Sequence, residues 1–382
     1  MSYYGTLIYK ERLYRNWSQN GLCRGICSVS YLSKIEQGKV WPSDDVLLLL
    51  LERLNLKLDK SLEKQANLIV EEAYDALFSG NKKSLKLFEN DFCDDKYRTT
   101  PKWIDMCLLR QVMKNDQQPL QKCFEICMDK RQLAMQKMLQ GEYLEAVKLF
   151  PNAFFYYNAG LVLYQKGEDY TLALEYLQTS YNQAAKEGRP YLMMDSQLII
   201  GNCYCNQLDI EKMEKHYCIA KRLANALQCN EELNVIEYNE MSGKFEAGMY
   251  KESYEYFSRL ENPDILALHK LAVSCEKIGN IQEGLEALEK AKDMESEYPP
   301  TEYVKKMCDL VHFRLMHDDY LKWEAYGEML LGCFNRCLEK LPIGFAAFHL
   351  QWVLEWYTAT RQYKKAYDTL VYFPLKQYVN RF

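Results

Sequence analysis

A short helical face in the N-terminal part of the chain carries residue types that could read DNA. Ser30, Ser33 and Lys34 stand at i, i+3 and i+4, the spacing of neighbours on one side of a helix. Leu32 and Ile35 fall on the opposite side, where they would face a core. Hydroxyl groups and a lysine can hydrogen-bond base edges in the major groove, and an apolar side chain can contact a thymine methyl group. The predicted base-reading residues are Val29, Ser30, Ser33 and Lys34.

Four short helices are predicted around this face, because capping residues recur at their ends. They are expected at residues 4–15, 19–24, 28–37 and 43–54. Ser18, Ser28 and Ser43 precede three of the helices, where a hydroxyl can accept a hydrogen bond from a free backbone N–H. Gly25 and Gly38 stand where the second and third helices should end. In the first helix, the apolar residues Leu7, Ile8 and Leu13 alternate with Lys10, Glu11, Arg12 and Arg15, which predicts one basic face. In the fourth helix, the residues predicted to face the core are Val46, Leu47, Leu50, Leu51 and Leu54.

Charge is distributed unevenly along the 382 residues, whose net charge is −5. Residues 1–60 hold nine Lys or Arg and six Asp or Glu, a net charge of +3, whereas the remaining 39 basic and 47 acidic residues give −8. A local excess of positive charge suits contact with phosphate. The N-terminal segment is therefore the expected nucleic-acid contact.

The order and spacing of these residues resemble the helix-turn-helix of the phage-repressor superfamily, also called Cro/C1 or XRE. The shared positions are Ser18, Gln19, Leu22, Cys23, Gly25, Ile26, Ser28, residues 32–39, Pro42, Ser43, Leu47 and Leu54. The resemblance implies that Gln19 and Arg24 touch phosphate or the groove edge and that Lys39 grips the DNA backbone. Asn20 and Gly21 depart from the family, which prefers strong helix formers there. The alternative is a helical bundle that has lost DNA binding and whose lysines are only solvated charges.

Residues 61–382 repeat one pattern. A small residue or Gly lies inside a helix, a turn glycine follows seven residues later and an aromatic or aliphatic residue two residues after that, and a small residue and a large apolar one complete the pattern. Copies lie at residues 141–150, 160–173, 201–220, 248–257, 279–291 and 363–370. The pattern resembles the tetratricopeptide (TPR) repeat, in which small residues stand where two helices touch. Only 17 Gly and 10 Pro occur, which also favours long helices over a turn-rich β fold. We predict an all-α protein with a helix-turn-helix domain at 1–60 and a right-handed TPR-like α-solenoid at 61–382.

A Cro-like module before a degenerate TPR array resembles the RRNPP family, the peptide-pheromone-responsive regulators of Gram-positive bacteria. The resemblance implies a homodimer, a palindromic DNA operator and a short signalling peptide in the groove of the repeats. Asn side chains that hold a peptide backbone are typical of that family, and an amide offers both a donor and an acceptor. On the repeat frame, the groove-facing candidates are Tyr157, Asn158, Tyr164, Asn202, Asn206, Tyr238, Asn239, His269 and Lys270. The alternative for the array is a structural or dimerising scaffold without a ligand.

The remaining composition argues against metal, cofactor and membrane. Fourteen Cys are present, but they form no paired CxxC motifs and the five His do not cluster with them, so they are predicted to be small core residues. No signal peptide and no long apolar run is found, which predicts a cytoplasmic protein without a membrane span. No nucleotide-binding or hydrolase motif occurs, so we expect no cofactor and no enzymatic activity.

Two rival functions remain open from the sequence. One is a TPR protein that binds a partner protein, like the Rap-type regulators, with the N-terminal helices as a docking surface. The other is a DNA-binding repressor without a peptide ligand. The polar and basic face of the third helix favours DNA binding, because a docking bundle has no need of it.

Overall fold

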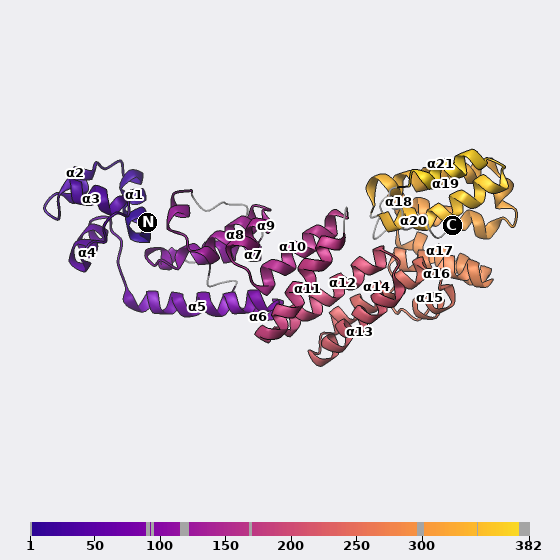
Figure 1. Ribbon diagram of the computed structural model, residues 1–382, viewed down its shortest axis with the longest axis horizontal. Coiled ribbons are helices and arrows are strands. Elements are labelled where there is room, and N and C mark those ends of the chain that lie inside the picture. Colours follow the sequence, from indigo (N-terminus) through magenta and orange to yellow (C-terminus); the bar gives the residue numbers. More distant parts are fainter. Residues whose placement is uncertain are drawn as a thin grey trace. The chain divides into compact units, whose positions relative to one another are not determined.

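The computed structural model describes residues 2–88, 92, 95–114, 122–167, 170–295, 302–341 and 343–373. Regular structure within these ranges is helical throughout and includes no strand (Figure 1). The all-α prediction is confirmed. In the same ranges, no helix combines the length and the apolar character that crossing a bilayer requires.

The chain forms two compact units, and the division passes through three helices. The first unit comprises residues 1–162 and 175–193, and the second comprises residues 163–174 and 194–382. The first unit contains α1 (Tyr3–Tyr14), α2 (Gln19–Cys23), α3 (Val29–Glu36), α4 (Asp44–Arg53), α5 (Lys60–Ser79), α6 (Lys82–Lys86), η2 (Asp95–Thr99), α7 (Trp103–Lys114), η3 (Lys122–Cys127), α8 (Lys130–Leu139) and α9 (Tyr143–Leu149). The helices divided between the units are α10 (Ala153–Lys166), α11 (Tyr170–Glu187) and α12 (Pro190–Asn206).

The second unit continues with helices joined by short turns (Figure 1). They are α13 (Ile210–Ala226), α14 (Asn230–Glu246), α15 (Tyr250–Phe257), α16 (Ile265–Ile278), α17 (Ile281–Met294), α18 (Glu302–Met316), η4 (Tyr320–Lys322), α19 (Glu324–Lys340), α20 (Ile343–Ala359) and α21 (Tyr363–Val371). Successive helices from α13 to α21 pack against one another, as TPR-like hairpins do.

The four N-terminal helices begin and end within a residue or two of the predicted bounds. The Ser18 hydroxyl accepts a hydrogen bond from Gly21 N at 3.0 Å, and the Ser28 hydroxyl accepts one from Tyr31 N at 3.2 Å. Gly25 has a φ of 77°, a left-handed conformation that glycine adopts without strain. The core residues are Leu7, Ile8, Leu22, Leu32, Ile35, Leu47, Leu50, Leu51 and Leu54. Two expectations fail, since Leu13 is 46% exposed and Val46 only half-buried.

The N-terminal helices pack directly on the segments that follow them in the first unit. The Tyr3 hydroxyl donates to the carbonyl of Arg98 at 2.5 Å, and the Arg98 guanidinium forms an ion pair with Glu11. The Tyr3 ring stacks on Phe124, with the ring centroids 5.7 Å apart. The first compact unit extends well past residue 60, so the two units do not correspond to the two predicted domains, whose boundary stays a prediction.

Turns between paired helices use residues in left-handed backbone conformation. Gly141, Gly248 and Gly279 have φ values of 82°, 83° and 87° at the turns α8–α9, α14–α15 and α16–α17, as the repeat pattern predicts. Leu208 and Arg361, both with a φ of 58°, occupy the equivalent turns α12–α13 and α20–α21. Only Gly adopts this conformation without a steric cost, so the chain carries local strain at these two turns.

Small residues lie where helices of the second unit touch. A methyl group added at Gly201 would collide with the ring of Tyr217, and one at Gly327 would collide with Trp356. Gly284 has Ala272 and Cys275 against it. This is the role that the TPR resemblance gives to small residues.

Candidate functional site

Helix α3 presents the face that the sequence predicts for DNA. Leu32 and Ile35 are fully buried, whereas Ser30 and Lys34 are exposed. Val29, at the N-terminal end, is 41% exposed although it is a large apolar residue. Ser33 is half-buried and its hydroxyl accepts a hydrogen bond from Gln37 Nε2 at 3.2 Å. The four predicted base-reading residues thus share one side of the helix.

A buried ion pair fixes α3 against the two preceding helices. Arg12 donates through Nε and Nη2 to the two carboxylate oxygens of Glu36, at 2.6 and 2.9 Å. Gln19 Nε2 donates to the same carboxylate at 2.8 Å, and Arg12 Nη1 donates to the Trp17 carbonyl at 2.8 Å. Hydrogen bonding to Glu36 raises the pKa of Arg12. Gln19, predicted to contact phosphate, therefore also ties α2 to α3.

The first helix, α1, does not present the solvated basic face that the sequence predicts. Arg12 is only 7% exposed and Glu11 only 2%, because each has partners of opposite charge within the fold. Helical periodicity alone predicts that Arg12 is solvated, because it cannot show that Arg12 pairs with Glu36, 24 residues further along the chain. Arg53 was also missed by the sequence reasoning. Its Nη1 donates to the Leu22 carbonyl at 2.9 Å and so fastens α4 to α2.

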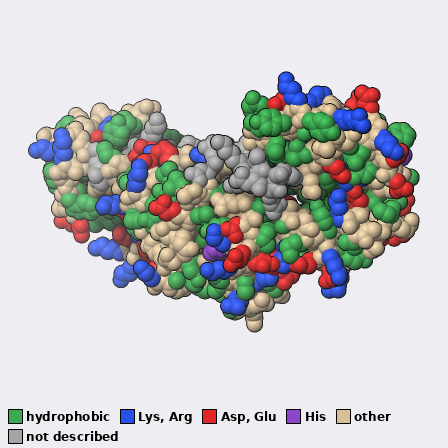
Figure 2. Space-filling model, turned by 45° about the vertical axis from the view of Figure 1, so that its right-hand side comes forward, with side chains coloured by type: hydrophobic (Ala, Val, Ile, Leu, Met, Phe, Trp, Pro, Cys, Tyr) green, Lys and Arg blue, Asp and Glu red, His purple; other side chains and the backbone are tan. Residues whose placement is uncertain are grey.

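The exposed basic residues near α3 are few. Arg24, Lys34 and Lys39 all lie at the surface. Trp41, which the sequence analysis assigned only to a turn, follows Lys39 by two residues and is 61% exposed. On the face seen in Figure 2, acidic and basic side chains are interspersed with apolar ones. The positive character of the N-terminal segment therefore depends on these individual residues.

The predicted peptide-binding residues are divided between the two units. Tyr157 and Asn158 belong to the first unit and the other seven to the second. Asn158 Nδ2 donates to the carbonyl of Phe154 at 2.8 Å, one turn back in α10. Its amide is thus partly engaged by its own helix.

An amide network joins three helices in the second unit. Asn202 Oδ1 accepts from the Tyr217 hydroxyl at 2.7 Å and from Asn239 Nδ2 at 3.3 Å. Asn206 Nδ2 donates to the Tyr170 hydroxyl at 3.0 Å, and the Tyr170 ring packs against Tyr164 with centroids 6.0 Å apart. The structure therefore brings Asn202 and Asn239 together, while their exposure to a peptide groove stays a prediction.

A second cluster surrounds the ammonium group of Lys270. Lys270 Nζ donates to the Tyr238 hydroxyl at 3.1 Å and lies 4.7 Å from the centroid of the same ring. The Tyr238 hydroxyl in turn donates to Asp264 Oδ1 at 3.3 Å. Burial lowers the pKa of Lys270 and raises that of Tyr238. His269 is different, because it is 1% exposed within the core, and burial lowers its pKa well below the usual range. It does not face a groove, contrary to the prediction.

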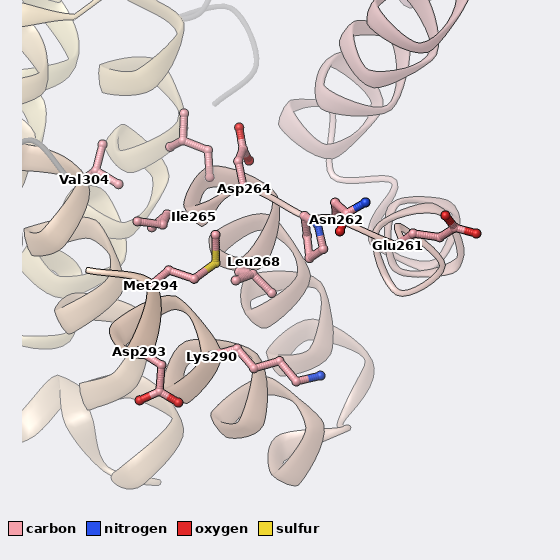
Figure 3. A pocket seen from close by; sticks show the side chains of 11 residues that line it. Glu261, Asn262, Asp264, Ile265, Leu268, Lys290, Asp293, Met294 and Val304 are labelled. Atoms are coloured by element: carbon pink, nitrogen blue, oxygen red, sulfur yellow. The ribbon is translucent and has the colours of Figure 1, made fainter. Parts of the chain in front are cut away.

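Two hollows adjoin this cluster and share the loop before α16. The larger has a volume of about 870 Å³ and is lined by Glu261, Asn262, Pro263, Asp264, Ile265, Leu266, Leu268, Lys290, Asp293, Met294 and Val304. Figure 3 shows the apolar side chains of Ile265, Leu268 and Met294 gathered at its floor. The smaller, of about 550 Å³, includes Tyr238 and Asp264 in its lining. An apolar floor with polar groups at its rim is typical of a ligand site.

The comparisons with known proteins agree with this architecture. Residues 8–61 match the family described as "Helix-turn-helix", so this segment is a helix-turn-helix domain. In such domains the second helix of the motif, which corresponds to α3 here, is the one that enters the major groove of DNA. No curated protein matches the sequence.

Three solved structures match parts of the chain. One is a Rap protein in complex with Competence and Sporulation Factor, with 15% identity, a TM-score of 0.57, and coverage of 82% of this chain and 99% of that one. The second is PlcR of Bacillus thuringiensis in complex with the peptide PapR7 and DNA, with 16% identity, a TM-score of 0.33, and coverage of 61% and 98%. The third is ComR from S. thermophilus in complex with DNA and its signalling peptide ComS, with 12% identity, a TM-score of 0.31, and coverage of 63% and 99%. The likeness to the Rap protein shows a common helical-repeat fold.

Proposed function

We propose that the protein is a transcriptional regulator that reads DNA with α3. The observation that carries this proposal is the exposed polar end of α3 within a helix-turn-helix domain. Val29, Ser30, Ser33 and Lys34 are the base-reading residues, whereas Gln19, Arg24 and Lys39 contact phosphate. Base contacts specify the sequence, and phosphate contacts fix the register of the protein on the duplex.

The operator is palindromic and the protein binds it as a homodimer. Two-fold symmetric proteins present two recognition helices that read two equivalent half-sites. The RRNPP resemblance of the sequence supports this assignment.

A short signalling peptide is the ligand of the helical array. Its site lies in the second unit, where the amides of Asn202 and Asn239 lie near each other and the apolar hollow adjoins Tyr238 and Asp264. An extended peptide presents backbone donors and acceptors that side-chain amides can satisfy, and an apolar side chain can fill the hollow. Tyr164 and Asn206, which belong to the same unit, complete the proposed set, whereas Tyr157 and Asn158 belong to the first unit and are not part of it. Lys270 is left out because it is only 8% exposed. His269 is left out because it is buried.

The decisive experiment is selection of a binding site from random duplex DNA with the full-length protein, followed by affinity measurements on variants. Ser30→Ala and Lys34→Ala should each lose about 1–3 kcal/mol on the selected site and little on random DNA, as base contacts do. Lys39→Ala should weaken binding to both and flatten the salt dependence.

Lys57→Ala is the matched control, since Lys57 is an exposed lysine outside the proposed interface. It should bind like the wild type. Equal losses on selected and random DNA for Ser30→Ala, Lys34→Ala and Lys39→Ala would refute the base-reading assignment.

A second candidate is a regulator that binds a partner protein through its N-terminal helices. The fold shared with the Rap protein over 82% of this chain favours it. It is distinguished by the same selection, because such a protein would enrich no DNA sequence at low salt. A third reading, a DNA-binding repressor without a peptide, would enrich a DNA site but no peptide from a random library.

A further inference from the structure

Three side chains with metal-binding chemistry meet between α19 and α20, outside the sites described above. Cys333 and Cys337 stand one turn apart on α19, and His349 lies on α20. The sulfur and imidazole donor atoms all lie within 4.8 Å of one another, and each side chain is fully buried. Within the described part of the chain, this is the one group of three or more His, Cys, Asp or Glu with such spacing.

The imidazole of His349 is held in the tautomer that a metal ligand needs. Its Nδ1 lies 2.7 Å from the carbonyl oxygen of Phe345. A carbonyl can only accept, so Nδ1 carries the proton and Nε2 has a free lone pair. That lone pair faces the thiols, with Nε2 3.8 Å from Cys333 Sγ. Metal-bound histidines commonly donate their second ring N–H to a carbonyl in this way, which fixes the ring orientation.

The nitrogen-to-sulfur separation is close to the one that a tetrahedral zinc ion imposes. Zn–S bonds of about 2.3 Å and Zn–N bonds of about 2.0 Å place sulfur and nitrogen roughly 3.6 Å apart, and two sulfurs roughly 3.8 Å apart. The observed distance of 3.8 Å from Nε2 to Cys333 Sγ is close to the first value. No large rearrangement of the two helices is needed to reach these distances.

We propose that Cys333, Cys337 and His349 bind one Zn²⁺ ion. Two thiolates and a neutral imidazole balance the charge of a divalent ion, which suits a fully buried site because an uncompensated charge there is costly. A monovalent ion such as Cu⁺ would leave a net negative charge. Binding releases the two thiol protons to solvent, and the fourth tetrahedral position is left for a water molecule or another donor.

This assignment revises the sequence-based expectation that the cysteines are only core residues and that no metal is bound. The two cysteines are four residues apart and the histidine twelve residues further on, which matches no common zinc motif. Only the pairing of α19 with α20 brings the histidine to the thiols. The ion would join these two helices and stabilise the C-terminal part of the second unit.

The test uses the reduced full-length protein, stripped of metal and titrated with Zn²⁺ against a chromogenic chelator. We expect one ion and two released protons per chain. Cys333→Ser, Cys337→Ser and His349→Gln each remove one ligand, and each should lower the zinc affinity on the order of 100-fold. Loss of an outer-shell partner costs up to about that much, and loss of a direct ligand should cost at least as much. Cys275→Ser is the matched control, because Cys275 is an equally buried thiol elsewhere in the same unit. It should keep one ion.

A measurement on the wild type alone covers the case in which a variant fails to fold. Zinc should raise the melting temperature of the stripped wild-type protein, since a ligand that binds only the folded state stabilises it. Co²⁺ in place of zinc should give the sulfur-to-metal charge-transfer absorption of thiolate ligands. A folded wild type that takes up no zinc, or zinc uptake unchanged in the Cys333→Ser and Cys337→Ser variants, would overturn the proposal.

Discussion

At the scale of single residues, burial decides what a charged side chain does. Lys34 is solvated and available to DNA, whereas Arg12, of the same sign, is enclosed and bonded to Glu36. Both were visible in the sequence as members of helical faces. The exposed end of α3 was predictable because its core residues, Leu32 and Ile35, define which side faces out. The enclosure of Arg12 was not, because it depends on the packing of α1 on α3.

The buried pair gives a prediction for the stability of the helix-turn-helix. Glu36→Gln removes the charge opposite Arg12 and should destabilise the domain by about 3–5 kcal/mol, the cost of leaving a buried charge unpaired. The double variant Arg12→Met/Glu36→Leu should recover most of that loss, because both charges of the pair are then removed and neither is left buried without its partner. Chemical denaturation followed by circular dichroism measures both.

Glu52→Gln serves as the control, since Glu52 is an exposed acid on α4. Its change in unfolding free energy should be close to zero. If Glu36→Gln changes the free energy of unfolding as little as Glu52→Gln does, the Arg12–Glu36 ion pair does not stabilise the domain and the prediction is wrong.

At the scale of elements, turn chemistry explains which parts of the array the sequence revealed. Gly248 and Gly279 mark turns that the repeat pattern located correctly, because glycine at a left-handed position is visible in the sequence. The turn between α12 and α13 has Leu208 where the pattern expects a turn glycine, whereas Gly201 lies inside α12 against Tyr217, as the pattern predicts for its helix-interior glycine. The fold class was therefore predictable, while individual repeat bounds were not.

The same observation predicts opposite effects of two turn substitutions. Arg361 has a φ of 58° and is exposed, so Arg361→Gly should relieve left-handed strain and raise stability by roughly 0.5–1 kcal/mol, after the extra entropy that glycine gains in the unfolded chain. Gly248→Ala should lower stability by roughly 1 kcal/mol for the converse reason. Thermal melts of the two variants beside the wild type measure the effect. A loss of stability in Arg361→Gly would show that its side chain has a role that outweighs the strain.

The candidate peptide site was predictable only in part, for the same physical reason. The repeat pattern places Asn202 and Asn239 on inner helices, but it did not predict the hydrogen bond that joins them. His269 and Lys270 are both buried in α16, at 1% and 8% exposure, because this helix is enclosed by its neighbours, and a repeat pattern cannot show that enclosure. The hollow beside α16 depends on the loop between α15 and α16, for which no sequence motif exists.

At the scale of the whole molecule, the proposed operator geometry can be tested without knowing the ligand. A homodimer with two helix-turn-helix domains should protect two half-sites whose centres lie about 34–36 Å apart, or a multiple of that distance. Footprinting on the selected DNA gives the spacing, and sedimentation at micromolar concentration gives the oligomeric state with and without that DNA. A monomer in both conditions would contradict the dimer and the palindrome together.

The link between peptide and DNA is a thermodynamic claim about the whole molecule. If one ligand changes the affinity for the other, the second must change the affinity for the first by the same factor. A peptide that shifts operator affinity tenfold, about 1.4 kcal/mol, must therefore bind tenfold differently to the operator-bound protein. The peptide is obtained from a random library selected on the full-length protein and titrated by calorimetry with and without the selected DNA.

Asn239→Ala is the variant of choice for this measurement. Asn202 accepts a hydrogen bond from the buried hydroxyl of Tyr217 at 2.7 Å, so its removal would also disturb the fold, whereas Asn239 donates a longer hydrogen bond, 3.3 Å, to Asn202. We expect Asn239→Ala to weaken peptide binding by roughly 1–3 kcal/mol, the cost of an unpaired backbone group, while operator affinity without peptide stays unchanged. Tight peptide binding that is identical with and without operator would leave a protein that binds both ligands independently, with no equilibrium switch between them.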